Sequence, residues 1–354
     1  MQSLDEKEWA EFRIGDLFEV SRPTARNKDN YQAGGVPFVA SGSVNNGVMK
    51  LCAPLEDEPL DKGGCITVSP VDGSTFYQPM DFLGRGGAGS SILMLRSDKL
   101  DLYRGLFMSR AIQQTCSKYT YGHMGNKDSI KRERVMLPVD DAGEPDYEYM
   151  AEYTRQKREA MLDKYFEYAE ERVAELGDIV DIPALDEKEW THFKMPEVFD
   201  LIQRGKRLKN ADHVPGIVPY VSSTANNNGV DDYIEATPGT RVFGDCISLA
   251  NSGSVGTAFY EPFEYVASDH VTALKTEGMS KYVYLFLTAT IEKQGSNFNF
   301  NREINDARIK NMQIMLPVDD VGEPDYAYME QYAKNMMLRK YRQYLAFLER
   351  DAEE

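Results

Sequence analysis

Hydrophobic and polar residues follow the same pattern twice along this chain of 354 residues. In each half, short apolar runs separated by Gly, Pro, Asn and Asp come first, which is typical of short strands joined by turns. These runs are residues 36–40, 65–69 and 92–95 in the first half, and 242–249 and 266–274 in the second. The next segment predicts a helix in each half, at 102–115 and 281–292, and a final short strand follows at 134–137 and 312–316. The fold class predicted is α+β.

The repetition extends to the residues themselves. Residues 4–9 (Leu-Asp-Glu-Lys-Glu-Trp) return unchanged at 185–190, and the run 137–147 returns almost unchanged at 316–326. An offset of about 180 residues is far too long for a solenoid repeat, so it indicates a duplicated domain. The segments between the matching ends diverge in sequence. This favours a common fold whose loops carry two different binding specificities. Ordinary drift of loops after duplication is the alternative.

Each half ends in a long polar segment that predicts a helix. A Pro followed by a capping Asp precedes each segment, at Pro145-Asp146 and Pro324-Asp325. Apolar residues then recur every three or four positions, which is the spacing of a helix-to-helix seam. The predicted seam is Leu162, Phe166, Ala169, Val173 and Leu176 against Met337, Tyr341, Tyr344 and Leu348. We expect two pseudo-symmetric domains joined by helices packed as an antiparallel coiled coil, although each stripe could instead pack on its own domain.

This reading divides the chain into four parts. A first domain covers residues 1–145, a first connecting helix 146–182, a second domain 183–324 and a second helix 325–354. No apolar run reaches membrane-spanning length, and the first residues lack a secretory signal. Cys65 and Cys246 occupy matching places in strand-like runs, so we expect packed thiols in a reducing cytoplasm.

The net charge of −17 argues against a nucleic-acid partner if it is read as a single number. Its distribution weakens that objection, because residues 146–181 alone hold 11 Asp and Glu against 5 Lys and Arg, whereas residues 5–144 are nearly balanced. The second domain is distinctly acidic. Binding to phosphates requires a local basic surface and not a basic protein.

The order of motifs resembles one known family. The motifs are the opening Trp-x-x-Phe, then Val-Pro-Phe/Tyr-Val, the run from Gly244 to Tyr260, Ala267-Ser268-Asp269-His270-Val271, and a closing Ile-x-Leu-Pro before a long helix. Together with the duplication they resemble the specificity (S) subunits of restriction–modification systems over essentially the whole chain. The closest likeness is to type IIB systems, with type I next. The first repeat departs from the pattern at residues 62–65 and 84–91.

The resemblance implies two target recognition domains that read a bipartite double-stranded DNA target through base edges in the major groove. It implies methyltransferase and nuclease subunits as partners, possibly fused in one chain, and no membrane. S-adenosylmethionine and Mg²⁺ would belong to those partners, so no cofactor, metal or catalytic residue is expected here. Consistent with this, the sequence contains no Asn-Pro-Pro-Tyr or Asp-Pro-Pro-Tyr motif of adenine methyltransferases.

Candidate DNA contacts are basic, amide and aromatic residues in Gly- and Asn-rich segments. In the first repeat they are Arg22, Arg26, Lys28, Asn45, Asn46, Arg85, Lys118, Tyr119 and Tyr121. In the second they are Arg204, Lys206, Arg207, Lys209, Asn226, Asn227, Asn299, Asn301 and Arg302. Asn suits the adenine edge, but Asn-Gly is equally typical of a hairpin turn. The alternating aromatic and polar residues could also belong to a half-buried strand.

Other chemistry receives little support. The glycine run 84–89 formally matches a dinucleotide-binding fingerprint, but a strand-like run follows it where a helix should begin. The acidic turns near residues 140 and 319 lack the ligand spacing of a calcium loop, and we expect His270 to be structural beside Asp269. Two alternatives stay open: a complete enzyme of unknown type, and a protein-interaction or DNA-mimicking decoy that binds methyltransferase subunits without reading DNA.

Overall fold

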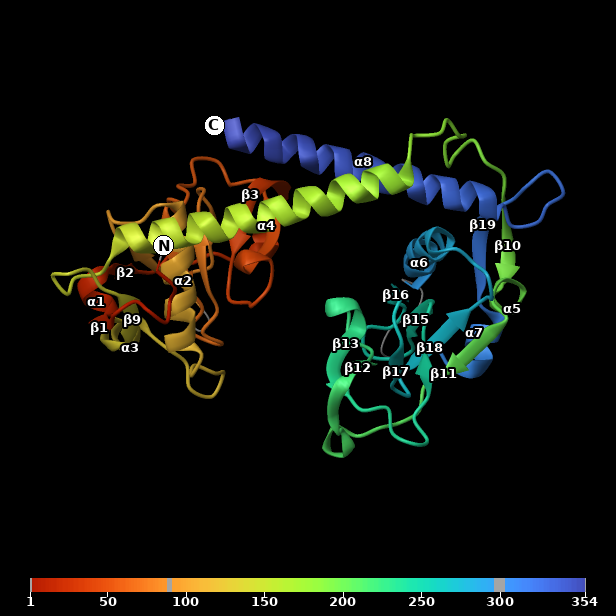
Figure 1. The fold of residues 1–354 in the computed structure, drawn as a ribbon, viewed down its shortest axis with the longest axis horizontal. Helices are drawn as coiled ribbons and strands as arrows, with labels where there is room; N and C mark the ends of the chain where they lie inside the picture. The colour runs from red at the N-terminus through yellow and green to blue at the C-terminus, as the bar shows by residue number, and fades with distance from the viewer. Residues whose placement is uncertain (1, 88–90, 296–302, 354) are drawn as a thin grey trace. The chain divides into compact units, whose positions relative to one another are not determined.

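The computed structural model describes residues 2–87, 91–295 and 303–353. The chain divides into two compact units, Met1–Tyr165 and Phe166–Glu354, and each mixes helices with sheets (Figure 1). The predicted α+β class is therefore confirmed. Within the described residues, we find no helix that combines the length and the apolar character needed to cross a membrane.

The first domain is built from three small sheets. A two-stranded antiparallel sheet pairs its ends, β1 (Trp9–Arg13) with β9 (Arg134–Pro138). A four-stranded antiparallel sheet has the order β2 (Glu19–Ser21), β8 (Leu93–Arg96), β5 (Cys65–Val68) and β6 (Thr75–Gln78). A three-stranded sheet has the order β4 (Val48–Cys52), β3 (Ala33–Val39) and β7 (Leu83–Gly84). The helical segments are α1 (Ile14–Leu17), η1 (Lys28–Asn30), η2 (Asn45–Gly47), α2 (Leu102–Cys116) and α3 (Lys127–Arg132).

The second domain repeats this plan. Its ends pair as β10 (Trp190–Lys194) with β19 (Gln313–Pro317). One four-stranded sheet has the order β11 (Leu201–Arg204), β18 (Val271–Lys275), β15 (Cys246–Ala250) and β16 (Ala258–Glu261), and α6 (Lys281–Gly295) lies against β15 and β16 (Figure 1). The other has the order β13 (Val230–Ile234), β12 (Pro215–Val221), β17 (Tyr265–Ala267) and β14 (Val242–Phe243). The remaining helical segments are α5 (Met195–Val198), η3 (Asn210–Asp212), η4 (Asn227–Gly229) and α7 (Asp306–Asn311).

Two of the strands expected in the second half are each broken in two. The run 242–249 becomes β14 and β15, and Asp245 between them has a φ of 49°. The run 266–274 becomes β17 and β18. In both cases the two pieces belong to different sheets. Apolar periodicity alone hides such a break, because both pieces are buried.

Apolar residues from the sheets and helices form a separate core in each domain. Cys65 and Cys246 lie at the same place in the two cores and are fully buried. All four cysteines are free thiols, and burial raises the pKa of Cys65 to about 11. The expectation that Cys65 and Cys246 are packed thiols is confirmed.

The two long helices begin as the sequence predicts. They are α4 (Tyr147–Leu176) and α8 (Tyr326–Glu353). Asp146 Oδ1 accepts the backbone N–H of Tyr149 at 2.9 Å, and Asp325 Oδ1 accepts that of Tyr328 at 2.9 Å. Such caps satisfy N–H groups that have no partner within the helix.

Within the second unit, the last part of α4 runs antiparallel to α8. The Tyr168 and Tyr341 hydroxyls are 3.3 Å apart. Beyond the end of α4, Asn335 exchanges two hydrogen bonds with the backbone of Val180, of 3.1 and 2.7 Å. Tyr168 thus meets Tyr341, whereas Val180, later in the chain, meets the earlier residue Asn335, which is the order of an antiparallel arrangement. Asn335 is buried, so it anchors the connecting segment on α8.

The exposure of the predicted seam residues varies. Ala169 and Leu348 are buried, whereas Tyr344 keeps 44% of its surface exposed. The remaining members are half-buried: Leu162, Phe166, Val173, Leu176, Met337 and Tyr341. The structure also buries Leu338, which the heptad spacing left out.

Candidate nucleic-acid interface

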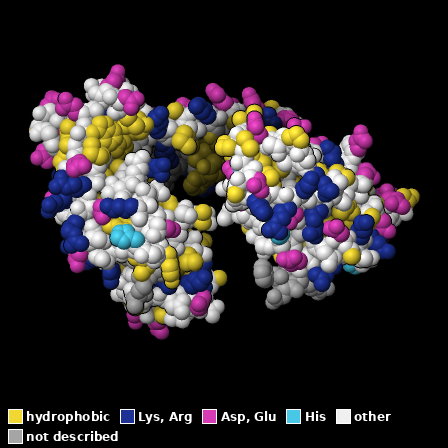
Figure 2. Space-filling view, turned by 90° about the horizontal axis from the view of Figure 1, so that it is seen from below, with side chains coloured by type: hydrophobic (Ala, Val, Ile, Leu, Met, Phe, Trp, Pro, Cys, Tyr) yellow, Lys and Arg dark blue, Asp and Glu magenta, His cyan; other side chains and the backbone are white. Residues whose placement is uncertain are grey.

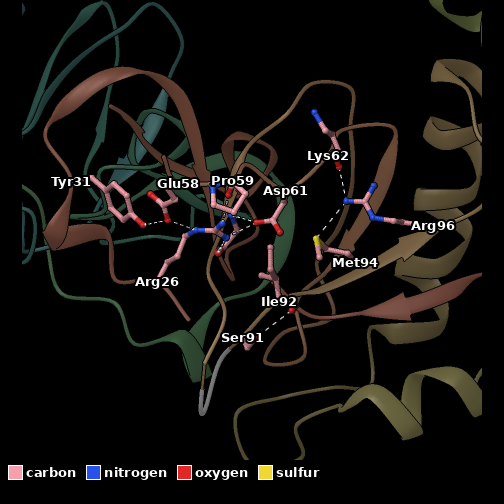
Figure 3. Close-up of polar contacts among 11 residues, drawn as sticks. Arg26, Tyr31, Glu58, Pro59, Asp61, Lys62, Ser91, Ile92, Met94 and Arg96 are labelled. Atoms are coloured by element: carbon pink, nitrogen blue, oxygen red, sulfur yellow. Dashed lines mark hydrogen bonds and ion pairs between the residues drawn. The ribbon is translucent and has the colours of Figure 1, made fainter. Parts of the chain in front are cut away.

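Arg26 lies inside the first domain and not on its surface. Its Nε is 2.7 Å from Glu58 Oε1, and its Nη1 is 2.6 Å from Asp61 Oδ2 (Figure 3). Further bonds reach the backbone oxygens of Pro59 and Gly84. With 8% of its surface exposed, Arg26 is committed to internal partners, and we correct its assignment as a DNA contact.

The Arg26 cluster holds together segments that carry exposed cations. Asp61, which binds Arg26, also accepts the backbone N–H of Gly84 at 2.9 Å. Arg85 follows directly and its own N–H donates to Val39 O at 2.8 Å, so its backbone is fixed while its side chain is exposed. Arg22 and Lys28 on the Arg26 segment are exposed as well. Arg22, Lys28 and Arg85 therefore stay predicted DNA contacts.

The asparagine pairs form matching turns in the two domains. Asn45 and Asn46 have φ values of 50° and 56°, and Asn227 and Asn228 have 50° and 52°. Asn46 Nδ2 donates to Tyr77 O and to Gln78 Oε1, both at 3.2 Å. Asn46 therefore has a structural role in its turn. Asn45, Asn46, Asn226 and Asn227 are all exposed and stay predicted DNA contacts.

In the basic cluster of the second domain, Arg204 already binds groups of its own domain. Arg204 is half-buried, and its guanidinium lies 3.2 Å from Ile304 O and 3.1 Å from Asp306 Oδ1. Lys206, Arg207 and Lys209 are exposed. In Figure 2, Lys and Arg side chains lie among Asp and Glu on the visible face of each domain. Exposed cations and carboxylates are thus interspersed on this face.

The candidate contacts in the aromatic segment before β9 differ in exposure. Tyr119 is 3% exposed and its hydroxyl donates to Glu133 at 2.6 Å. Burial and the Glu133 carboxylate raise the pKa of Tyr119 to about 12, so this residue is structural and not a stacking platform for a base. Lys118 is ion-paired with the same carboxylate. Tyr121 is 83% exposed and available.

The corresponding segment of the second domain carried three predicted contacts. These are Asn299, Asn301 and Arg302, and they lie outside the described residues.

A polar hollow of about 260 Å³ opens on the second domain, and sequence reasoning missed it as a site. Ser222, Asp231, Asp269 and His270 line it together with Arg207, among others. The His270 side chain keeps 57% of its surface exposed, while its Nδ1 lies 2.5 Å from the Ser252 hydroxyl. The expectation of a structural histidine beside Asp269 stays a prediction. The motif Ser268-Asp269-His270 was the available signal, and its place at the end of a short strand was not visible in the sequence.

Among the described residues, no group of three His, Cys, Asp or Glu side chains is arranged to hold a metal ion. The glycine run at 84–87 follows β7 and lies beside the Arg26 segment through a bridge between Ala25 and Gly86. A side chain at Gly86 would meet Pro23 O and Thr24 O at 2.1 Å. These glycines therefore permit the backbones to approach closely.

Comparison with known proteins places this geometry in a family. The model of the type I restriction modification DNA specificity domain matches twice, at residues 6–162 and 187–344. The type II restriction enzyme BgcI specificity subunit S.BcgI of Heyndrickxia coagulans is 30% identical over 336 residues, which cover 93% of this chain and 94% of that one.

Solved structures with similarity include the type I restriction–modification S subunit from M. genitalium, at 14% identity and a TM-score of 0.46, covering 98% of this chain and 95% of that one. The HsdS subunit from Thermoanaerobacter tengcongensis matches at 14% identity and a TM-score of 0.33, covering 97% and 91%. The two family matches together span most of the chain, and so does the match to the Heyndrickxia coagulans subunit. The chain therefore belongs to the family of restriction–modification DNA specificity subunits, with two copies of the specificity domain.

Proposed function

We propose that this chain is the non-catalytic, DNA-reading subunit of a restriction–modification complex, and that each domain reads one half of a bipartite target. The observation that carries the proposal is that the two domains share one arrangement of strands but differ in their exposed loops. The end strands pair in the same register, with Trp9 opposite Pro138 and Trp190 opposite Pro317. The loops between them carry different side chains, as two different half-sites require.

Exposed cations on each domain would bind phosphates and set its position on DNA, while other loop residues would read bases. The net charge of −17 does not prevent this, because screening at physiological salt limits the reach of distant charges to about 8 Å. Many of the acidic residues lie on α4 and the segments flanking it, where 11 fall between residues 146 and 181. That acidic surface is available for partner subunits and not for phosphates.

Methyltransferase and nuclease subunits would supply S-adenosylmethionine, Mg²⁺ and both reactions. The missing adenine-methyltransferase motif supports this division of labour. The four buried thiols suit a reducing cytoplasm. Incubated alone with S-adenosylmethionine and DNA, the chain should transfer no methyl groups, and transfer by the partner-free chain would contradict the proposal.

Selection of bound sites from a random DNA library tests the reading function. The complex of this chain with its methyltransferase subunit should enrich two short sequence blocks separated by a gap of fixed length. The half-site geometry of the protein sets such a gap. Enrichment of no sequence would exclude a reading function.

A DNA-mimicking decoy is the second candidate, and the acidic composition favours it. A decoy would bind the methyltransferase subunit and reduce its binding to every DNA. The same selection distinguishes the two, because a decoy complex enriches nothing, whereas a specificity subunit creates a sequence preference that the partner lacks alone.

A further inference from the structure

A β-bulge aims one side chain out of the ladder in the second domain. Tyr220 pairs with Asp232 and Val221 pairs with Val230, so Asp231 between them has no partner on β12. Bulges of this kind re-aim a side chain and are common beside functional sites. The Asp231 side chain is exposed and lines the polar hollow.

The first domain has the same bulge with a different residue in it. Phe38 pairs with Lys50 and Val39 pairs with Val48, so Met49 is the unpaired residue. Met49 keeps 48% of its surface exposed. An apolar side chain therefore stands in one domain where a carboxylate stands in the other, on the same backbone frame.

A second pair of equivalent positions follows β7 in the first domain and β17 in the second. These strands run parallel to β3 and β12, respectively. Ser268 N donates to Val221 O at 3.0 Å, just as Arg85 N donates to Val39 O at 2.8 Å. These bonds show that the segment starting at Arg85 is equivalent to Ser268-Asp269-His270. The first domain thus presents a guanidinium here, and the second presents the Asp269 carboxylate and an imidazole.

In the second domain the two positions meet in one place, because Asp231 and Asp269 both line the 260 Å³ hollow. Arg207 and Lys209 line the same hollow, and these cations offset the repulsion between carboxylates and phosphates. The Ser252 hydroxyl lies 2.5 Å from His270 Nδ1, and His270 Nε2 lies 3.9 Å from Asp269 Oδ1. Ser252 thus holds His270 beside Asp269 at the hollow.

We propose that Asp231 and Asp269 read bases in the second half-site. In the first half-site we assign this role to Met49, at the position equivalent to Asp231, and to Arg85, at the position of Ser268 next to Asp269. This inference rests on the proposed reading function. A carboxylate accepts a hydrogen bond from an exocyclic amino group, above all cytosine N4, whereas arginine pairs with guanine O6 and N7, and apolar groups contact the thymine methyl. The two domains would thus read different bases from one frame.

The test uses the complete complex and bound-site selection. Asp269→Asn and Asp231→Asn replace an acceptor-only carboxylate by an amide, which prefers the adenine edge. Each should change the preferred base at one position of the second half-site, by roughly ten-fold or more in relative enrichment, and leave the first half-site unchanged. Asp320→Asn is the matched control, because it removes the same charge from an exposed turn away from the hollow.

The reciprocal variant Arg85→Ser should weaken the base preference at one position of the first half-site and leave the second half-site unchanged. Thermal unfolding of each variant checks that its fold is retained. Equal loss of binding to every sequence, or an unchanged second half-site in both Asp variants, would overturn the inference while the wild-type preference still supports the reading function. If the wild-type complex enriches nothing, the proposed function itself fails.

Discussion

Glu261 creates a difference in stability between the two domains that can be measured. Its side chain is fully buried, its Oε1 accepts the Ser248 hydroxyl at 2.8 Å, and its Oε2 has no hydrogen-bond partner among the described residues. Burial raises the pKa of Glu261 to about 7, and the bond from Ser248 only partly opposes this shift. The equivalent residue of the first domain is Gln78, whose amide donates to Thr67 Oγ1 and to Asn46 O, both at 3.0 Å.

The sign of the effect follows from the raised pKa. Below pH 4.5 the carboxyl is protonated in both the folded and the unfolded chain, so it adds no dependence on pH. As pH rises to about 7, the unfolded chain releases the proton while the folded chain retains it, and the free energy of unfolding falls. A shift from 4.5 to about 7 corresponds to about 3 kcal/mol, at roughly 1.4 kcal/mol per pH unit. Above pH 7 this loss is constant.

Glu261→Gln should remove the loss, because glutamine is neutral at every pH and reproduces the side chain of the first domain. The variant should therefore gain about 3 kcal/mol over the wild type between pH 4.5 and pH 8. Urea unfolding followed by the fluorescence of Trp190, in a Trp9→Phe background, reports on the second domain. The reciprocal Gln78→Glu should destabilise the first domain at pH 8 and much less at pH 4.5. An equal effect of Glu261→Gln at both pH values would refute the reasoning.

Two further changes test the DNA surface and the helices. Replacing Lys206, Arg207 and Lys209 by Ala should weaken binding of the complex to all DNA. The slope of log binding constant against log salt concentration should fall by up to about three, since each phosphate contact contributes roughly 0.9. An unchanged slope in a folded variant would show that the cluster does not contact the duplex. Inserting four residues after Glu171 should lengthen α4 by roughly 6 Å and widen the gap between half-sites by about two base pairs, at roughly 3.4 Å each. Site selection from a random-spacer library measures this gap, and an unaltered gap would assign the spacing to the partner subunits.

The sequence was sufficient for the features that depend on local chemistry and on repetition. The capping residues Asp146 and Asp325, the buried Cys65 and Cys246, and the duplicated α+β plan all follow from residue type and spacing. The resemblance of motifs supplied the family, which composition and periodicity do not contain.

The sequence was misleading where tertiary partners decide a side chain's role. Arg26 and Tyr119 look like surface contacts in the sequence, but distant carboxylates at Glu58, Asp61 and Glu133 hold them inside the first domain. Removing one member of a buried ion pair such as that of Arg26 with Asp61 typically costs about 3–5 kcal/mol, so Arg26 serves the fold. The hollow lined by Asp231 and Asp269 was missed for the same reason, because 38 positions separate the two residues in the chain.

Exchange of one domain is the most direct test of the claim that each domain reads its own half of the target. Residues 10–136 would be replaced by those of a related specificity subunit with a known, different target, and the complex would be tested by bound-site selection. The account predicts that one sequence block changes to that of the donor, while the other block and the gap are retained. A change in both blocks, or in neither, in a folded chimera would contradict it.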